Sequence, residues 1–163
     1  MTNGSLRRTD SAERVIVASA QVVYLALLDP KAVTRWLPPE GMTGHVHAFE
    51  AKEGGRYRMA LVYDKSEHGN RGKTSDETDI VEGRFVELRP NERVVQQVEF
   101  ESEDPAFAGI MTITWAPETI SGGTRVRVTC ANVPEGISRE DHEAGLSSTL
   151  ANLAGFTERN PRA

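Results

Sequence analysis

Histidines are the side chains of this sequence best suited to metal binding or proton transfer. His45 and His47 are two positions apart, so on a β-strand both rings would point to one face and could bind a metal ion. No third ligand follows at a matching spacing, so we predict no metal site and interpret both rings as exposed or groove-lining. His68 lies in a polar stretch and is expected to be solvated. His142 shares the apolar face of a predicted helix and could titrate inside a dry pocket.

Acid–base chemistry at His142 would need a carboxylate beside the ring, and the candidates are Glu82, Glu99 and Glu101. Alternation along their strand places Glu99 and Glu101 on the face opposite the apolar residues, which points both side chains outward. We therefore assign no catalytic residue. An enzyme that uses His142 stays open as an alternative.

No pattern typical of an activated nucleophile or a phosphate site occurs. There is no Gly-x-Ser-x-Gly motif, and the one cysteine, Cys130, falls in an apolar strand pattern that indicates packing. A single cysteine also excludes an internal disulfide bond. Gly54-Gly55 lacks the Lys-Ser/Thr and the helix of a phosphate-binding loop, so a bulged hairpin explains it better. We expect neither a cofactor nor redox chemistry.

Length, charge and hydrophobicity limit the number of domains and the kinds of partner that we expect for this protein. The 163 residues and 17.9 kDa fit one domain with a real core. A formal charge of −5 with scattered basic residues argues against a nucleic-acid partner. No apolar run approaches the roughly 20 residues that span a bilayer, and no signal-peptide core follows the N-terminal arginines. We expect no membrane insertion and a cytoplasmic location.

Helical patterns near both ends of the chain would position Trp36 and His142. The predicted segments are a flexible tail at 1–12, a short strand at 15–18, helices after Ser19 and at 30–36, and a long helix after Ser138, within a single domain at 13–159. Ser19 and Ser138 are candidate N-caps, and Asp29-Pro30 ends the first helix. The helix at 30–36 would deliver Trp36.

Between the helices the hydrophobic period changes to two, which predicts strands. We place these strands near 43–51, 55–64, 77–88, 92–101, 107–116 and 123–131. Glycine, proline and asparagine turns separate them, and such short connections favour an antiparallel meander. The charge-rich stretch at 65–76 is expected to be a mobile hairpin tip.

Several short motifs carry a family resemblance. They are Ala18-Ser19-Ala20, Asp29-Pro30, Trp36 with Pro38-Pro39-Glu40-Gly41, Gly54-Gly55-Arg56-Tyr57, Gly83-Arg84-Phe85 with Pro90-Asn91-Glu92-Arg93-Val94, and Gly123-Thr124-Arg125-Val126. With this order of elements, the chain resembles the START-like, or SRPBCC, superfamily. Over about 13–158 it is most similar to bacterial proteins like the C-terminal domain of the heat-shock-protein-90 ATPase activator.

The resemblance implies an α+β helix-grip fold, in which a curved antiparallel sheet of six or seven strands wraps around the long C-terminal helix. Such a sheet and one helix cannot close completely, so some large side chains should line a ligand cavity. The predicted ligand-binding residues are Trp36, Tyr57, Met59, Tyr63, Phe85, Gln96, Met111, His142 and Leu146. Gln96 would be the polar anchor, since a buried amide needs a partner. Relatives often have Gly-Trp where this chain has Gly145-Leu146, so a relative's ligand is not carried over.

Three functions fit this sequence. The first is non-enzymatic binding of a small hydrophobic molecule, with a link to stress response or chaperone function. The second is a cyclase-like or hydrolase-like enzyme acting on an aromatic or polyketide-like substrate. The third is a co-regulator of a heat-shock chaperone ATPase that acts through its surface. Either a monomer or a homodimer is compatible with the sequence.

Overall fold

The computed structural model describes residues 8–39, 41–63 and 78–159. Its seven strands form one antiparallel sheet in the order β1-β7-β6-β5-β4-β3-β2. The strands are β1 (Asp10–Ile16), β2 (Met42–Phe49), β3 (Arg56–Tyr63), β4 (Thr78–Arg89), β5 (Arg93–Phe100), β6 (Ile110–Ile120) and β7 (Gly123–Ala131). Apart from the β1 pairing, each strand pairs with its neighbour in sequence. This confirms the predicted meander.

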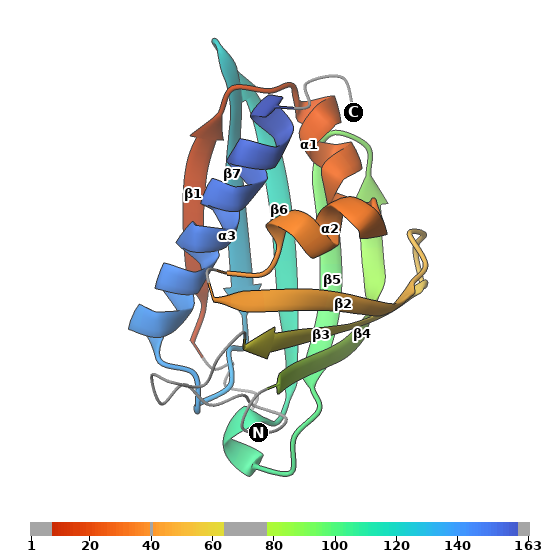
Figure 1. The fold of residues 1–163 in the computed structure, drawn as a ribbon, viewed down its shortest axis with the longest axis vertical. Helices are drawn as coiled ribbons and strands as arrows, with labels where there is room; N and C mark the ends of the chain where they lie inside the picture. Colours follow the sequence, from red (N-terminus) through yellow and green to blue (C-terminus); the bar gives the residue numbers. More distant parts are fainter. Residues whose placement is uncertain (1–7, 40, 64–77, 160–163) are drawn as a thin grey trace, which may run out of the picture.

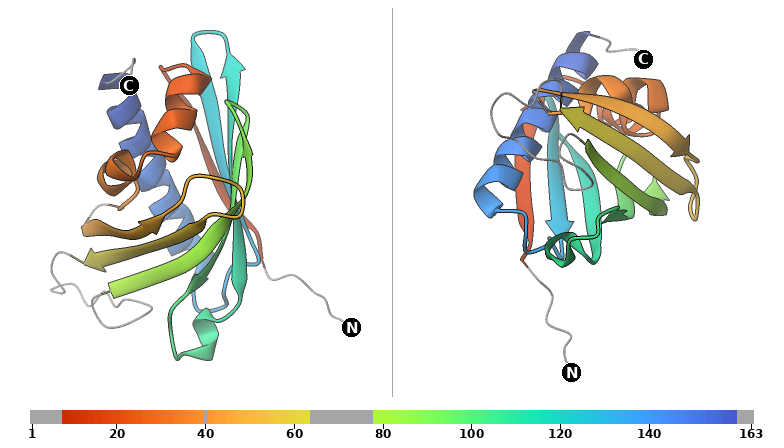
Figure 2. Two further views of the ribbon diagram at one scale, coloured as in Figure 1. Left: turned by 90° about the vertical axis from the view of Figure 1, so that its right-hand side faces the viewer. Right: turned by 60° about the horizontal axis from the view of Figure 1, so that its bottom comes forward.

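Three α-helices lie on one face of the sheet (Figure 1). They are α1 (Ala20–Leu27), α2 (Pro30–Trp36) and α3 (Arg139–Arg159). The predicted caps form, because Ser19 Oγ accepts from the Val22 amide at 3.1 Å and Ser138 Oγ accepts from the Asp141 amide at 3.1 Å. Figure 2 shows β2, β3 and β4 curling beneath the helices, so that the sheet partly encloses them. The helix-grip α+β fold is confirmed. In the described ranges, no helix combines the length and the apolar character that crossing a bilayer requires.

Irregularities in β2 and β4 bend the sheet. The pairing register shifts between Val46 and Ala48, and again between Phe85 and Glu87. Gly83, near the second shift, approaches β5 so closely that an added Cβ would lie 1.8 Å from the Gln97 carbonyl oxygen. Only glycine fits between these two backbones.

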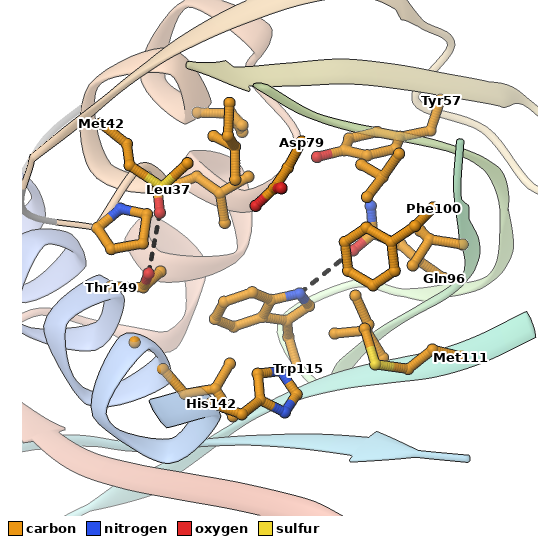
Figure 3. Close-up of a pocket in the computed structure, with 18 of the residues that line it drawn as sticks. Leu37, Met42, Tyr57, Asp79, Gln96, Phe100, Met111, Trp115, His142 and Thr149 are labelled. Carbon is orange, nitrogen blue, oxygen red and sulfur yellow. Dashed lines mark hydrogen bonds between the residues drawn. The ribbon is translucent and has the colours of Figure 1, made fainter. Parts of the chain in front are cut away.

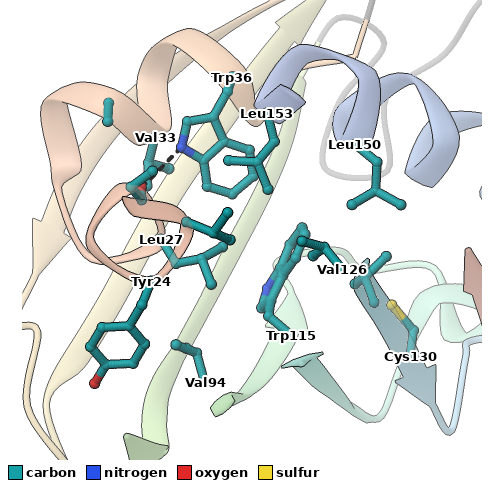
Figure 4. Close-up of a cluster of buried hydrophobic side chains, with 14 of the residues drawn as sticks. Tyr24, Leu27, Val33, Trp36, Val94, Trp115, Val126, Cys130, Leu150 and Leu153 are labelled. Atoms are coloured by element: carbon teal, nitrogen blue, oxygen red, sulfur yellow. Dashed lines mark hydrogen bonds between the residues drawn. The ribbon is translucent and has the colours of Figure 1, made fainter. Parts of the chain in front are cut away.

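The core lies between the inner face of the sheet and the helices (Figure 4). Trp36 from α2 meets Trp115 from β6 edge to face, with ring centroids 5.4 Å apart. The Trp36 indole Nε1 donates to the Ala26 carbonyl oxygen at 3.0 Å, which ties α2 to α1. Leu150 and Leu153 of α3 are buried in the same cluster. The predicted apolar face of the last helix is therefore confirmed.

Two strand predictions have wrong boundaries. The strand predicted at 107–116 is β6 at Ile110–Ile120, because Pro105–Phe107 forms a 3-10 helix before it. The strand predicted at 15–18 ends at Ile16 and also begins earlier. β1 begins at Asp10 rather than at residue 15, so residues 10–12 belong to the sheet and not to a tail. Asp10 is opposite Cys130 of β7, and this long-range pairing fixes the segment despite its polar composition. The remaining predicted tail, at 1–7, and the predicted hairpin tip at 65–76 lie outside the described residues.

Candidate functional site

A cavity of about 360 Å³ lies between the concave side of the sheet and α3 (Figure 3). Its described lining consists mainly of apolar and aromatic side chains from α1, α2, α3 and strands β2 to β6. These residues are Leu27, Val33, Trp36, Leu37, Pro39, Met42, Phe49, Tyr57, Leu61, Tyr63, Val81, Val94, Val98, Phe100, Met111, Ile113, Trp115, Ile137, Gly145 and Leu146. Transfer of an apolar molecule from water into this lining would be favourable, because apolar surface would be buried on both sides.

Five polar side chains also line the cavity among the described residues: Asp79, Gln96, Asp141, His142 and Thr149. Thr149 Oγ1 donates to the Leu37 carbonyl oxygen at 2.9 Å, which holds α3 against the segment after α2. Gln96 Oε1 accepts from Trp115 Nε1 at 3.3 Å. The other three residues are ionisable, and none of the described lining residues is a lysine or arginine.

The two cavity tyrosines stay neutral. Burial raises the pKa of Tyr57, whose hydroxyl donates to Met59 Sδ at 3.2 Å. Burial also raises the pKa of Tyr63, and the charges of Asp79 and Asp141 add to that rise. Neither hydroxyl can therefore act as a phenolate base near neutral pH.

His142 is oriented by a buried carboxylate. Asp10 is 0% exposed, and its Oδ2 lies 2.8 Å from Nδ1 of His142. Arg8 forms two hydrogen bonds to the same carboxylate, at 2.7 and 2.9 Å, and Arg139 Nε lies 3.4 Å from Oδ1. The Arg8 guanidinium also donates to the Ile137 carbonyl oxygen. This cluster joins β1 to the start of α3.

The charge state of Asp10 follows from its partners. Burial raises the pKa of this carboxyl, but hydrogen bonds from Arg8 and His142 outweigh burial and bring the pKa below its usual value. An ionised Asp10 can only accept, so Nδ1 of His142 carries the proton of their shared hydrogen bond. The cavity thus contains an imidazole of fixed orientation.

Sequence comparison identifies the family of this chain. A family model described as Activator of Hsp90 ATPase homolog 1-like protein matches residues 17–158, nearly the whole domain. The chain belongs to this family. Among curated proteins, no sequence matches the chain.

Solved structures agree with the family assignment. Protein CV1439 from Chromobacterium violaceum is 31% identical, with a TM-score of 0.81 and coverage of 92% of this chain and 96% of that one. An AHSA1-like protein from Aeromonas hydrophila is 17% identical, with a TM-score of 0.67 and coverage of 94% of both chains. DynU16, described as a putative protein in the dynemicin biosynthetic locus, is 18% identical with a TM-score of 0.65, covering 94% of this chain and 48% of its own. The last two show a shared fold.

In this family member, seven of the nine residues predicted to bind a ligand line the cavity: Trp36, Tyr57, Tyr63, Gln96, Met111, His142 and Leu146. Met59 and Phe85 do not, and their assignment is corrected. Both side chains are fully buried and do not reach the cavity surface. Phe85 packs against Phe49 and Tyr57, with ring centroids 5.3 and 5.9 Å away. A ligand contact by the seven lining residues stays a prediction.

The carboxylates considered as partners of His142 lie elsewhere. Glu99 and Glu101 are exposed, as alternation predicted, and Glu82 pairs with Arg56 and Arg58 outside the cavity. The partner is Asp10, which the sequence does not reveal because its polar segment resembles a flexible tail. Asp79, Asp141 and Thr149 were also missed as cavity residues.

The remaining candidates for chemistry lie outside the cavity. His45 and His47 are exposed on β2, and the described residues contain no group of three metal-ligating side chains. Burial raises the pKa of the Cys130 thiol to about 12, so the thiolate that nucleophilic attack needs does not form at neutral pH. His68 lies outside the described residues.

Acid should weaken the Asp10 cluster. Since the folded-state pKa of Asp10 lies below the unfolded value of about 4, its stabilisation is present above pH 4 and is lost as pH falls through the folded pKa. We expect Asp10→Asn to lower the free energy of unfolding by about 2 kcal/mol at pH 7, with the deficit shrinking on acidification. Urea denaturation of both proteins between pH 2.5 and 7 measures this. A deficit that does not change with pH would contradict the account.

Proposed function

We propose that this protein binds a small hydrophobic ligand in the cavity between its sheet and α3, without catalysing a reaction on it. The observation that carries the proposal is the cavity of about 360 Å³ with its apolar and aromatic lining. Pockets of this size and character are typical of small-molecule sites.

The charges in the cavity favour a neutral ligand. Asp79, which is 3% exposed, and Asp141 both line it, and the described lining includes no cationic side chain of lysine or arginine. A fatty acid or another organic anion would bring its charge close to the buried carboxylate of Asp79 and toward that of Asp141, which is exposed at the start of α3. A neutral aromatic or alicyclic molecule avoids that cost.

Filling the cavity from α3 should abolish binding. Gly145 lines the cavity, and an added Cβ would meet no atom within 4 Å, so the leucine of Gly145→Leu can occupy ligand space without displacing the backbone. We expect this variant to bind the neutral dye N-phenyl-1-naphthylamine at least about tenfold more weakly than the wild type, through lost volume and lost contact area. Fluorescence titration measures the affinity.

Gly155→Leu is the matched control. Gly155 lies on the same helix outside the cavity, and an added Cβ there has the Arg159 guanidinium as its nearest neighbour at 3.6 Å. Both variants replace a helical glycine by leucine, so helix propensity changes alike. Equal dye affinities in the two variants would contradict the proposal.

A second candidate is an enzyme of the cyclase or hydrolase kind that acts on an aromatic or polyketide-like compound. The observation that favours it is the pairing of His142 with Asp10 at 2.8 Å beside the cavity, since a carboxylate that orients an imidazole is typical of general-base sites. A carrier releases its ligand unchanged. An enzyme releases a different compound, which a hydrolase changes in mass and a cyclase can leave at the same mass, so chromatography combined with mass spectrometry separates the two cases.

A third candidate, regulation of a chaperone ATPase, rests on the family's description alone. The described surface offers no feature that selects such a partner, and we propose no contact face for it.

A further inference from the structure

Gln96 presents an amide to the cavity with only one of its two ends paired. The residue lies on β5, is 8% exposed and belongs to the cavity wall. Its Oε1 accepts from Trp115 Nε1 at 3.3 Å, as the dashed line in Figure 3 shows. An indole N–H can only donate, so Oε1 must face Trp115 and the amide orientation is fixed. Nε2, with two N–H donors, has no acceptor among the described residues.

The surroundings of Gln96 explain why the protein supplies no acceptor. Val94 and Val98 flank it on the same face of β5, and Phe85 of β4 and Ile113 of β6 stand opposite it in the two neighbouring strands. All four are apolar. A buried donor without an acceptor is destabilising and rare in native structures, so this group is suited to an acceptor brought from outside.

We infer that the ligand is a neutral carbonyl compound whose oxygen accepts a hydrogen bond from Nε2 of Gln96 while its apolar frame fills the cavity. The inference rests on the proposed function and deepens it by naming a chemical class: ketones, esters, amides and quinones. A carboxylate could also accept from Nε2, but Asp79 and Asp141 line the same cavity and disfavour an anion.

Two probes of nearly equal shape test the assignment. In 2-isopropenylnaphthalene a methylene group replaces the carbonyl oxygen of 2-acetylnaphthalene, so the acceptor is lost and the frame is kept. Their affinities are measured by displacement of N-phenyl-1-naphthylamine from wild type and from Gln96→Met. Comparing the ketone-to-alkene affinity ratio between proteins cancels the different hydration of the two probes. We expect that ratio to fall roughly tenfold in Gln96→Met.

Gln97→Met is the matched control for this experiment. Gln97 is the next residue on β5 and faces away from the cavity, with Oε1 accepting from Arg84 Nη2 at 3.3 Å. Its variant should keep the wild-type ratio. A ratio that is the same in all three proteins, with the alkene still bound, overturns the donor role of Gln96 and leaves the cavity proposal intact. Failure of dye and both probes to bind wild type overturns both proposals.

A measurement on the wild type alone covers the case in which Gln96→Met does not fold. The carbonyl ¹³C resonance of bound, carbonyl-labelled 2-acetylnaphthalene should move downfield from its position in hexane, because a hydrogen bond withdraws electron density from that carbon. A resonance at the hexane position would show a bound ketone without a donor. That result overturns the inference.

Discussion

Gly83→Ala is expected to destabilise the protein by about 5 kcal/mol or more, the largest loss among the substitutions proposed here. An added Cβ would lie 1.8 Å from the Gln97 carbonyl oxygen and 2.8 Å from the Val98 Cα. Both atoms belong to the β5 backbone and cannot rotate away. The alanine would therefore force β4 from β5, the strand that contributes Gln96 to the cavity wall. Urea denaturation measures the loss.

Gly145→Ala is the control for Gly83→Ala. The same methyl group is added at Gly145 in α3, where a Cβ meets nothing within 4 Å. We expect a gain of about 0.5–1 kcal/mol from helix propensity. If Gly83→Ala proved as stable as the wild type, the close approach of β4 and β5 in this structure would be wrong.

Trp36→Ala should have the next largest effect, a loss of about 3–5 kcal/mol in the free energy of unfolding. Trp36 is 2% exposed, packs edge to face on Trp115 and donates to the Ala26 carbonyl oxygen. Truncation removes the ring between α2 and the sheet and leaves that carbonyl without its donor. Thermal and urea denaturation would both report the change.

Trp36→Phe separates packing from hydrogen bonding. Phenylalanine keeps an aromatic ring at the contact with Trp115 but cannot donate to Ala26, so we expect a loss of about 1–2 kcal/mol. Equal losses for the alanine and phenylalanine variants would show that the indole hydrogen bond, rather than ring packing, dominates at this position.

The fold could be predicted because its signals are local. Period-two alternation fixed which face of each strand turns inward, so Tyr57, Gln96 and Met111 were placed correctly on the cavity side. The caps at Ser19 and Ser138 fixed where helices begin. Motif order then supplied the family, which the match over residues 17–158 confirmed.

Depth within the curved sheet could not be predicted, because alternation gives the face of a strand and not its distance from the cavity. Met59 has the same parity as Tyr57, but its side chain packs against Gly44 of β2. A Cβ added to Gly44 would lie 2.6 Å from the Met59 Cε. Phe85 is likewise covered by Phe49 and Tyr57. The distance of each side chain from the cavity depends on how β2 and β4 bend.

Asp79, which lines the cavity, and Asp10, which contacts the cavity residue His142, differ in the signals that the sequence offers for them. Asp79 has the parity of Val81 and Phe85, so alternation places it on the inner face, but its charge and the charged stretch before it suggest a solvated position. Asp10 offered only the weak signal of sharing parity with Ala12 and Ile16. Its burial depends on pairing with β7 more than a hundred residues away, and no local pattern encodes such a contact.

Native mass spectrometry of the protein purified from the organism that encodes it tests ligand binding most directly. The account predicts a noncovalent adduct of a neutral organic molecule on the wild type and on Gly155→Leu, and no such adduct on Gly145→Leu. An adduct retained by Gly145→Leu would contradict binding in the cavity between the sheet and α3. A wild-type protein that carries no adduct and binds no N-phenyl-1-naphthylamine would contradict the ligand-binding function itself.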